Sequence, residues 1–445
     1  MTTATETFDA IVVGARCAGC ATAIALARAG KRVIAVDRTA FPSDTLSTHL
    51  LFAGGVSELK ELGALERAEA SGAPRAPAAF MAAKEMEVTA GYTPNDQGIN
   101  YGLSVRRIEL DMALVETARE AGAEVREKTK VTELLWENER VVGVTATGED
   151  GEAYELRAPL VVGADGRKSF VARQLGVDEP YKQNPNKRAC VFAYWKDNRP
   201  EWRPIMAQWR EGDELGTAFP CNEGLVMVLL MPPVEDGPEY RKGLEEAYLR
   251  GVDKIPALRE RLDGCEIASK VRISTDHPAF FRRSSGPGWA LPGDAGHFKD
   301  PVTAQGIRDA LRYGRRLGEH AAPAIGDPVA LDRALRAWEK EREDDCLEIY
   351  QWTNLLARAE TMNPVEEEAY RVMSQQPGLA RPMLDTFART IRPSKAFSPA
   401  FMTKVAVRAV ARPGRRPEAV KIAVREAKLE LAARKERRAA RKSWN

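Results

Sequence analysis

The sequence predicts an α/β fold that begins with a βαβ unit, continues through an inserted, mainly β region and ends in helices. Three patterns support this prediction. Residues 8–14 (FDAIVVG) form a continuous apolar run typical of a buried parallel strand, and a helical pattern and a second apolar run follow by residue 38. Residues 180–275 contain several short strand-like runs, and residues from Leu331 onward show long helical spacing.

Length and composition indicate a globular protein with more than one domain. The chain has 445 residues and a mass of 49.0 kDa, enough for two or three domains with cores of their own. It has no apolar run long enough for a membrane span, and its first residues do not resemble a secretory signal. With six cysteines and no sign of a disulfide framework, we expect the reducing cytoplasm as the location.

The βαβ unit carries a dinucleotide-binding pattern. Gly14 ends the first apolar run, a small-residue helix follows, Gly30 closes it, and Asp37 ends the second run. The glycine motif G-x-G-x-x-G runs from Gly14 to Gly19, with Arg16 in place of its middle glycine. We expect the helix N-terminus to bind a pyrophosphate and Asp37 to bind ribose hydroxyls. The predicted nucleotide-binding residues are Gly14, Ala15, Arg16, Gly19, Asp37 and the neighbouring Arg38.

Cys17 and Cys20 form a C-x-x-C pair on the same residues. Such a pair indicates thiol redox chemistry or half of a zinc site in some intracellular proteins. No second pair and no clustered histidines complete a metal site here, so no metal is expected. The favoured interpretation is that both thiols belong to the first turn of the helix, although a helix N-terminus also makes a reactive Cys17 possible.

Three later stretches identify the nucleotide as a flavin. They are residues 158–176 with Asp165-Gly166, residues 288–311 with Gly293-Asp294, and residues 104–126 with Arg107 ahead of Leu110-Asp111. In this order, they resemble the FAD enzymes related to p-hydroxybenzoate hydroxylase, the group A flavin monooxygenases, and the geranylgeranyl-reductase-like FAD enzymes. The resemblance covers residues 8–320 in separate blocks and implies a Rossmann-like FAD-binding domain.

The resemblance also implies roles for individual residues. Asp294 would accept ribityl hydroxyls, Arg107 would reach ribityl or phosphate oxygens, and Asp165 would lie near the pyrophosphate. The remaining cofactor positions that the resemblance implies are Val131 at adenine, Thr48 and His49 at the isoalloxazine edge, and Pro301, Gln305, Gly306 and Ile307 at the flavin N1–C2=O edge. The catalytic residue stays unknown, with His49 as the one candidate. Each of these residues has an alternative interpretation. Asp165 and Asp294 could be plain turn aspartates. Arg107 could be a solvated arginine and His49 a core histidine.

The predicted domains follow these blocks. A discontinuous FAD-binding domain takes residues 1–75, 105–180 and 276–330, and a substrate-binding β-sheet domain takes residues 76–104 and 181–275. Residues 331–445 form a helical C-terminal region with a basic tail, in which residues 404–445 hold 14 Lys and Arg against 4 Asp and Glu. The tail stripe of Val420, Val424, Ala427 and Leu431 fits an amphipathic helix. Lipid or nucleic acid are possible partners, but docking on the chain's own body or a second subunit is favoured, and nucleic acid is not expected.

The function predicted from these features is FAD-dependent monooxygenation, in which a flavin C4a-hydroperoxide oxygenates an apolar, aromatic small molecule with O2. No second dinucleotide motif follows, so NAD(P)H would bind transiently or a separate flavin reductase would supply electrons. The first alternative is an FAD-dependent reductase of carbon–carbon double bonds, because residues 218–228 resemble a segment of the reductase-like enzymes. The second is a flavin-containing binding protein that acts through its basic tail. Halogenation is disfavoured because "YWKDNRPEW" does not match W-x-W-x-I-P.

Overall fold

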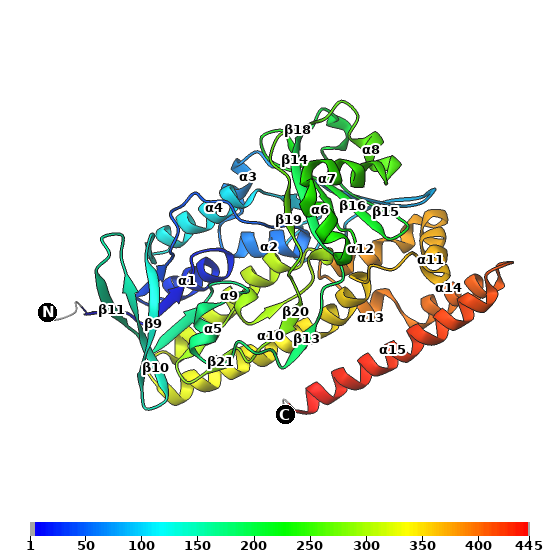
Figure 1. Cartoon of the computed structure of the whole chain (residues 1–445). Helices are drawn as coiled ribbons and strands as arrows, with labels where there is room; N and C mark the ends of the chain where they lie inside the picture. The colour runs from blue at the N-terminus through cyan, green and yellow to red at the C-terminus, as the bar shows by residue number, and fades with distance from the viewer. Residues whose placement is uncertain (1–4, 444–445) are drawn as a thin grey trace.

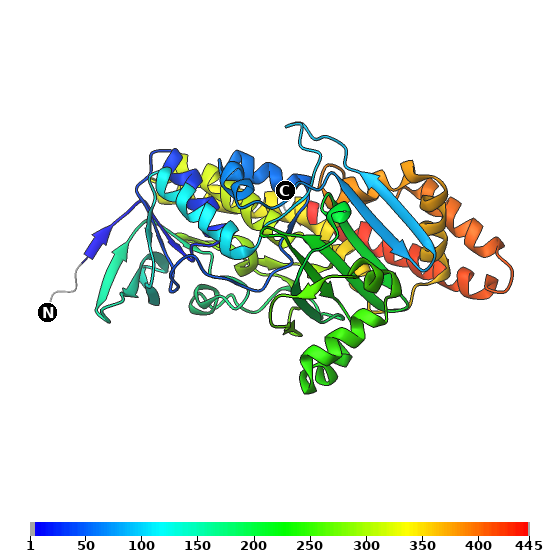
Figure 2. The same cartoon turned by 90° about the horizontal axis from the view of Figure 1, so that it is seen from above.

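The computed structural model describes residues 5–443, and the predicted α/β class is confirmed (Figure 1). The predicted domains also include residues 1–4 and 444–445, which lie outside the described range. Seen from above, the N-terminal sheets, the inserted sheet and the C-terminal helices follow one another along the molecule (Figure 2). The inserted sheet therefore lies beside the nucleotide-binding unit, whereas the long helix at residues 328–356 packs directly on that unit, against residues 306–321 and 285–286.

A six-stranded sheet forms the centre of the nucleotide-binding unit. Its order is β21 (Ser285–Gly286), β22 (Trp289–Ala290), β12 (Leu160–Gly163), β2 (Ala10–Val13), β3 (Val33–Val36) and β8 (Glu124–Arg126). All strands from β22 to β8 run parallel, and β12, β2 and β3 are buried throughout, as their apolar sequences require. The sheet therefore has its carboxyl ends at one edge, where the glycine turn lies.

Helices cover one face of this sheet and a second sheet covers the other. The helices are α1 (Cys17–Arg28), α4 (Arg107–Glu120) and α9 (Gly306–Ala321). α1 and α9 approach closely where Gly314 faces Ala18. A Cβ on Gly314 would lie only 2.4 Å from the carbonyl oxygen of Ala18. The second sheet has the order β1 (Thr5–Thr7), β11 (Ala153–Arg157), β10 (Arg140–Thr147) and β9 (Lys130–Glu137).

The inserted region forms an eight-stranded sheet. Its strands are β18 (Glu266–Ile267), β14 (Cys190–Lys196), β17 (Leu225–Leu230), β16 (Glu214–Pro220), β15 (Ile205–Glu211), β5 (Ala78–Ala83) and β6 (Met86–Gly91), with β19 (Arg272–Ser274) paired to β14. Three helices that the strand-like pattern did not predict cover one face: α6 (Gly237–Lys242), α7 (Leu244–Asp253) and α8 (Pro256–Arg261). Trp195 and Trp209 are buried under them, whereas Phe192 and Tyr194 lie on the opposite face with Leu50 and Ala304.

Smaller elements connect these units. The short strands are β4 (Leu50–Leu51), β7 (Leu103–Ser104), β13 (Lys182–Asn184), β20 (Ala279–Phe281) and β23 (His297–Phe298); the short helices are α2 (Ala53–Glu61), α3 (Leu65–Ala70) and α5 (Phe170–Gln174). The 3-10 turns are η1 (Pro200–Trp202), η2 (Val234–Asp236), η3 (Gly293–Ala295), η4 (Pro301–Thr303), η5 (Ala322–Ala324) and η6 (Pro377–Leu379). η3 and η4 lie in the stretch predicted to bind the flavin.

The C-terminal region is helical, as predicted. It consists of α10 (Pro328–Leu356), α11 (Pro364–Gln375), α12 (Arg381–Phe387), α13 (Pro393–Ala396), α14 (Pro399–Ala411) and α15 (Arg416–Ser443). α15 runs along the lower edge of this region (Figure 1), tied to the α10 side by ion pairs Arg358–Glu426 at 3.0 Å and Asp344–Arg441 at 2.9 Å. The basic tail therefore docks on its own body. Within residues 5–443, none of the helices combines the length and hydrophobicity that a bilayer span needs.

Candidate functional site

The glycine turn after β2 has the geometry of a phosphate cradle. Gly14 has φ +102°, and a Cβ there would lie 2.5 Å from the carbonyl oxygen of Ala164. A Cβ on Gly19 would lie 1.8 Å from the carbonyl oxygen of Gly14. α1 begins at Cys17, and the side chain of its N-cap residue, Arg16, does not cap it. The first N–H groups of α1 therefore remain available to an anion, as at other helix N-termini.

Asp37 braces this turn from the end of β3. Its carboxylate accepts hydrogen bonds from the Ala15 N–H at 2.9 Å and from the Thr39 N–H and hydroxyl at 2.9 and 2.6 Å. Its carbonyl accepts from the Thr129 N–H at 2.8 Å, two residues before Val131 in β9. The structure thus brings the predicted ribose and adenine residues together. The neighbouring Arg38 is exposed.

Two arginines meet on one carboxylate beside the turn. Arg107 donates from Nε and Nη2 to the fully buried Asp111 at 2.9 Å each, and Arg16 donates to the same carboxylate. Arg16 also donates to the Ser43 hydroxyl at 2.8 Å. The three groups sum to one positive charge next to the N-terminus of α1. This charge complements a pyrophosphate, which gives the departure from glycine at position 16 a physical account.

Asp294 is the unsatisfied acceptor of the site. It lies in η3, where Gly293 has φ +62° and approaches so closely that a Cβ on it would be 2.8 Å from Cβ of Ala18 in α1. Among residues 5–443, its partly buried carboxylate makes neither a hydrogen bond nor an ion pair. Burial raises its pKa, and the nearby His297 and Arg107 oppose that rise. A hydroxyl-bearing ligand would supply the missing donors.

Asp165 has a different surrounding. Its carboxylate accepts from the Ser169 hydroxyl at 2.5 Å and from the Phe170 and Val171 N–H groups at 2.6 and 3.1 Å. Asp165 thus binds the first N–H groups of α5, whose N-cap residue is Ser169, so its side-chain oxygens are already engaged. A Cβ on Gly14 would nevertheless lie 3.1 Å from the Asp165 backbone nitrogen, which places the Asp165 backbone beside the glycine turn.

The loop from Pro301 to the start of α9 presents a second helix N-terminus. Ala304 has φ +49°, and the Gln305 side chain donates to the carbonyls of Thr303 and Phe387 at 3.0 Å each. Gly306, the first residue of α9, is exposed, with open space where a Cβ would be. The Gln305 side chain thus holds the loop in place, while the N–H groups of Gly306 and Ile307 stay free for a ligand.

His49 is fully buried beside the inserted sheet. Its Nε2 hydrogen-bonds the Tyr194 hydroxyl, the two rings stack at 5.7 Å, and its Nδ1 is buried without a partner among the described residues. Burial lowers its pKa to about 3, with a further contribution from Arg107. The residue also adopts φ +59°, which a histidine rarely does. His49 is therefore a neutral imidazole close to Arg107, carried on a backbone in the left-handed region.

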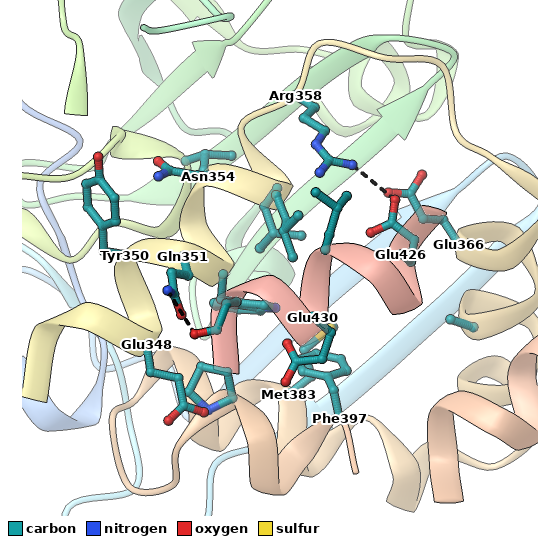
Figure 3. Close-up of a pocket in the computed structure, with 18 of the residues that line it drawn as sticks. Glu348, Tyr350, Gln351, Asn354, Arg358, Glu366, Met383, Phe397, Glu426 and Glu430 are labelled. Atoms are coloured by element: carbon teal, nitrogen blue, oxygen red, sulfur yellow. Dashed lines mark hydrogen bonds and ion pairs between the residues drawn. The ribbon is translucent and has the colours of Figure 1, made fainter. Parts of the chain in front are cut away.

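Two cavities adjoin the 301–304 loop. The smaller, of about 40 Å³, is bounded by Thr48 and Phe52 on one side and Pro301 and Ala304 on the other. The larger, of about 580 Å³, lies between the inserted sheet and the C-terminal helices (Figure 3). The two share lining residues, namely Met81, Gln208, Val302 and Phe387. In Figure 3, Gln351 and Asn354 of α10, Met383 of α12 and Glu430 of α15 surround the larger one.

Sequence reasoning missed two buried charged residues, Asp300 directly before the 301–304 loop and Arg188 at the larger cavity. Asp300 is 2% exposed, its Oδ1 accepts from the Val302 N–H at 3.0 Å, and its Oδ2 has no partner among the described residues. Burial raises its pKa to about 7. Arg188 is 1% exposed, lines the larger cavity and donates only to main-chain carbonyls, those of Asp213, Met231 and Arg358. An Asp before a Pro at a helix start hinted at Asp300, but nothing in the sequence marked Arg188.

The thiol interpretation of the opening motif has no support in the structure. Cys17 and Cys20 are buried, and burial raises the pKa of Cys17 to about 12 and that of Cys20 well above its usual value. Cys20 donates to the Ala15 carbonyl at 3.1 Å. Buried thiols of this kind are inert.

One further buried cluster joins His297, Asp309 and Cys346 within 4.8 Å. Lys299, Arg308 and Arg389 all contact the Asp309 carboxylate, and Arg389 also pairs with Asp345 at 2.7 Å. Three cations on one carboxylate oppose the binding of a metal cation. The cluster instead ties the start of α9 to the segment after α12.

The comparisons with known proteins agree with this geometry. Residues 7–353 match the model of the family described as FAD binding domain. A digeranylgeranylglycerophospholipid reductase of Methanocella arvoryzae is 29% identical over 248 residues, 55% of this chain and 60% of the relative, so the match spans less than two thirds of that protein. Digeranylgeranylglycerophospholipid reductase 2 of Methanopyrus kandleri is 30% identical over 361 residues, 75% of this chain and 83% of the relative.

Solved structures share the fold. The flavin-dependent brominase Bmp2 superposes with a TM-score of 0.76 at 19% identity, covering 91% of this chain and 99% of that chain. PqsL from Pseudomonas aeruginosa, described as "a probable FAD-dependent monooxygenase", superposes with a TM-score of 0.65 at 18% identity, covering 84% of this chain and 99% of that chain. At these identities, the likeness concerns the fold alone.

Proposed function

We propose, from the premise that this chain belongs to the FAD-binding-domain family and is an FAD-dependent oxidoreductase, that it is a monooxygenase of an apolar, aromatic small molecule. When bound, reduced FAD supplies the electrons that activate O2. The chain's own residues bind and orient the cofactor, keep water from it and hold the substrate.

The residues at the glycine turn fit FAD. The N–H groups of α1 and the pair Arg16 and Arg107 suit the pyrophosphate, and the unsatisfied Asp294 carboxylate suits ribityl hydroxyls. Asp37 and the backbone at Val131 are the proposed ribose and adenine contacts. The N–H groups at the start of α9 would stabilise negative charge on the flavin edge near N1.

The two adjoining cavities are the observation that carries the proposal. The smaller cavity is lined almost wholly by apolar side chains, and an apolar cavity of about 40 Å³ stays dry and admits a molecule the size of O2. The larger cavity has about 580 Å³, enough for a substrate of several rings. This arrangement suits a reaction in which oxygen is activated in one compartment and the substrate is held in the next.

Asp300 is our candidate for proton exchange at this site. It directly precedes the 301–304 loop, its Oδ2 is buried without a partner in the described part of the chain, and its pKa of about 7 allows both protonation states. His49 holds the Tyr194 hydroxyl by a hydrogen bond and stays neutral, so we assign this pair to positioning the sheet at the flavin edge.

A second candidate is reduction of carbon–carbon double bonds. The observation that favours it is the 30% identity to a geranylgeranyl-lipid reductase across 83% of that protein. The large cavity, which has both apolar and charged side chains in its walls, has room for an extended alkene as well as for an aromatic ring system. In both cases, we propose that NADH or NADPH binds transiently or that a separate flavin reductase delivers the electrons. A flavin-containing binding protein that acts through its basic tail remains the third proposal.

The distinguishing experiment reduces the holoprotein under anaerobic conditions and adds either O2 or an alkene, with a panel of planar aromatic compounds. Monooxygenation predicts reoxidation by O2 with oxygenated aromatic product, whereas reoxidation by the alkene without O2 would establish the reductase. Val302→Trp at the junction of the cavities should abolish product but keep O2 consumption as hydrogen peroxide. Val329→Trp, at a site 66% exposed, is the matched control.

A further inference from the structure

The tail helix α15 has two faces with different surroundings. One face lines the large cavity, through residues that include Glu426, Leu429, Ala433 and Glu436. At 3.6 residues per turn, Val420, Val424 and Leu431 lie on the opposite face. These three side chains are 44%, 49% and 59% exposed. α15 is thus an amphipathic helix with its second apolar stripe turned outward.

The acidic side chains of the tail do not share this outward face. Each is engaged in an ion pair: Glu418 with Arg415, Glu426 with Arg358, Glu430 with Arg434 and Arg437, and Glu436 with Lys182. The outward face carries Lys428, Lys435, Arg438 and Lys442, which are exposed and form no ion pair with any residue of the described chain. The outward face therefore carries its apolar side chains at residues 420–431 and its free cations at residues 428–442, toward the end of the helix.

We propose that this outward face of α15 binds the surface of an anionic lipid bilayer. The cations match the charge of the headgroups, and the three apolar side chains enter the boundary between headgroups and acyl chains. A nucleic acid would satisfy the cations but would leave Val420, Val424 and Leu431 against phosphates and sugars. Because the same helix walls the large cavity, an enzyme bound in this way holds its substrate cavity next to the bilayer, where apolar compounds concentrate.

Vesicle flotation with the flavin-loaded full chain tests the proposal. The probe is vesicles of phosphatidylcholine with about 30% phosphatidylglycerol, compared with pure phosphatidylcholine. We expect binding to the anionic vesicles that falls with added salt. The triple variant Lys428→Glu, Lys435→Glu, Arg438→Glu should bind at least about 100-fold more weakly. Val424→Ser with Leu431→Ser should bind roughly 10-fold more weakly, because two apolar side chains no longer leave water.

A matched control reverses three exposed lysines elsewhere, Lys196→Glu, Lys242→Glu and Lys270→Glu, for the same change in net charge. This control should keep its vesicle binding. The proposal fails if the wild type does not float with anionic vesicles, if the control loses binding as the α15 variant does, or if duplex DNA is bound in preference to vesicles. Flavin absorbance and circular dichroism verify folding of each variant. Flotation requires no turnover, so a negative result leaves the proposed oxidoreductase function untouched.

Discussion

Replacing Asp294 by alanine should separate cofactor affinity from protein stability. Its carboxylate has no donor within residues 5–443, and burial raises its pKa. In the apoprotein, the charged form is therefore destabilising. A folded pKa above the unfolded value gives stability that is complete below the unfolded pKa and is lost as pH rises through the folded one. Asp294→Ala should therefore leave the apoprotein as stable as the wild type at acid pH and more stable above neutrality.

The affinity of the Asp294→Ala protein for FAD should fall. A hydrogen bond to a charged acceptor contributes about 1.5 to 3 kcal/mol, and the proposed ribityl contact makes at least one such bond. Since 1.4 kcal/mol corresponds to a factor of ten, the dissociation constant for FAD should rise roughly 10- to 100-fold. Asp294 lies in a short 3-10 turn, and its side chain is less buried than the neighbouring Gly293 and Ala295, so the fold should survive the substitution.

Titration of apoprotein with FAD, followed by flavin fluorescence, measures the affinity, and thermal unfolding at two pH values measures the stability. Asp294→Asn, which keeps an acceptor without the charge, should fall between wild type and alanine. Asp178→Ala, at an exposed position after α5, is the control and should change neither quantity. An Asp294→Ala protein with unchanged FAD affinity would refute the assignment of η3 as the ribityl site.

The other predictions concern the thiols, Asp300 and the tail. Cys17→Ala with Cys20→Ala should keep bound flavin and turnover within a few fold, because both thiols are buried and protonated; loss of redox activity with flavin retained would contradict this. Burial raises the pKa of Asp300 to about 7, so its carboxyl ionises at a cost in stability as pH rises. The free energy of unfolding should therefore fall by up to about 4 kcal/mol between about pH 4 and pH 7. Asp300→Asn, which keeps the acceptor for Val302, should remove this pH dependence in denaturant titrations; an unchanged slope would mean that the carboxyl is not buried as described. Deletion of residues 413–445 removes one wall of the large cavity, so substrate affinity should fall while the flavin spectrum stays unchanged; a lost flavin spectrum would show that the tail supports the cofactor site.

The local patterns that could be read from the sequence were those with a fixed period or a fixed motif. The buried strands β2, β3 and β12, the start of α4 at Arg107 and the strands of the insertion all follow such patterns. The same reasoning missed α6 to α8, because the strand-like runs at residues 188–196, 205–210, 216–220 and 224–233 set the expectation for the whole insertion. The amphipathic spacing of Leu244, Tyr248 and Val252 is the signal that could have found α7.

Roles that depend on distant neighbours were beyond sequence reasoning. Asp111 follows Arg107 at helical ion-pair spacing, but its contact with Arg16 joins residues 95 positions apart. Asp165 shares its Asp-Gly pattern with the cofactor motifs, yet its side chain caps α5. Arg188 looks like any surface arginine in the sequence and is fully enclosed in the structure.

The ion-pair cluster at the start of α9 has a consequence for how this chain is re-engineered. The family match ends at residue 353, and yet Arg389 beyond it pairs with Asp309 and Asp345 inside it. Exchanging C-terminal segments with a relative at that boundary would leave the buried Asp309 and the partly exposed Asp345 with fewer cations. A broken buried pair costs about 3 to 5 kcal/mol. A chimera that keeps Asp309, Asp345 and Arg389 from one parent would preserve these ion pairs beside the proposed flavin loop. A segment exchange in this protein is therefore better made after residue 390 than at residue 353.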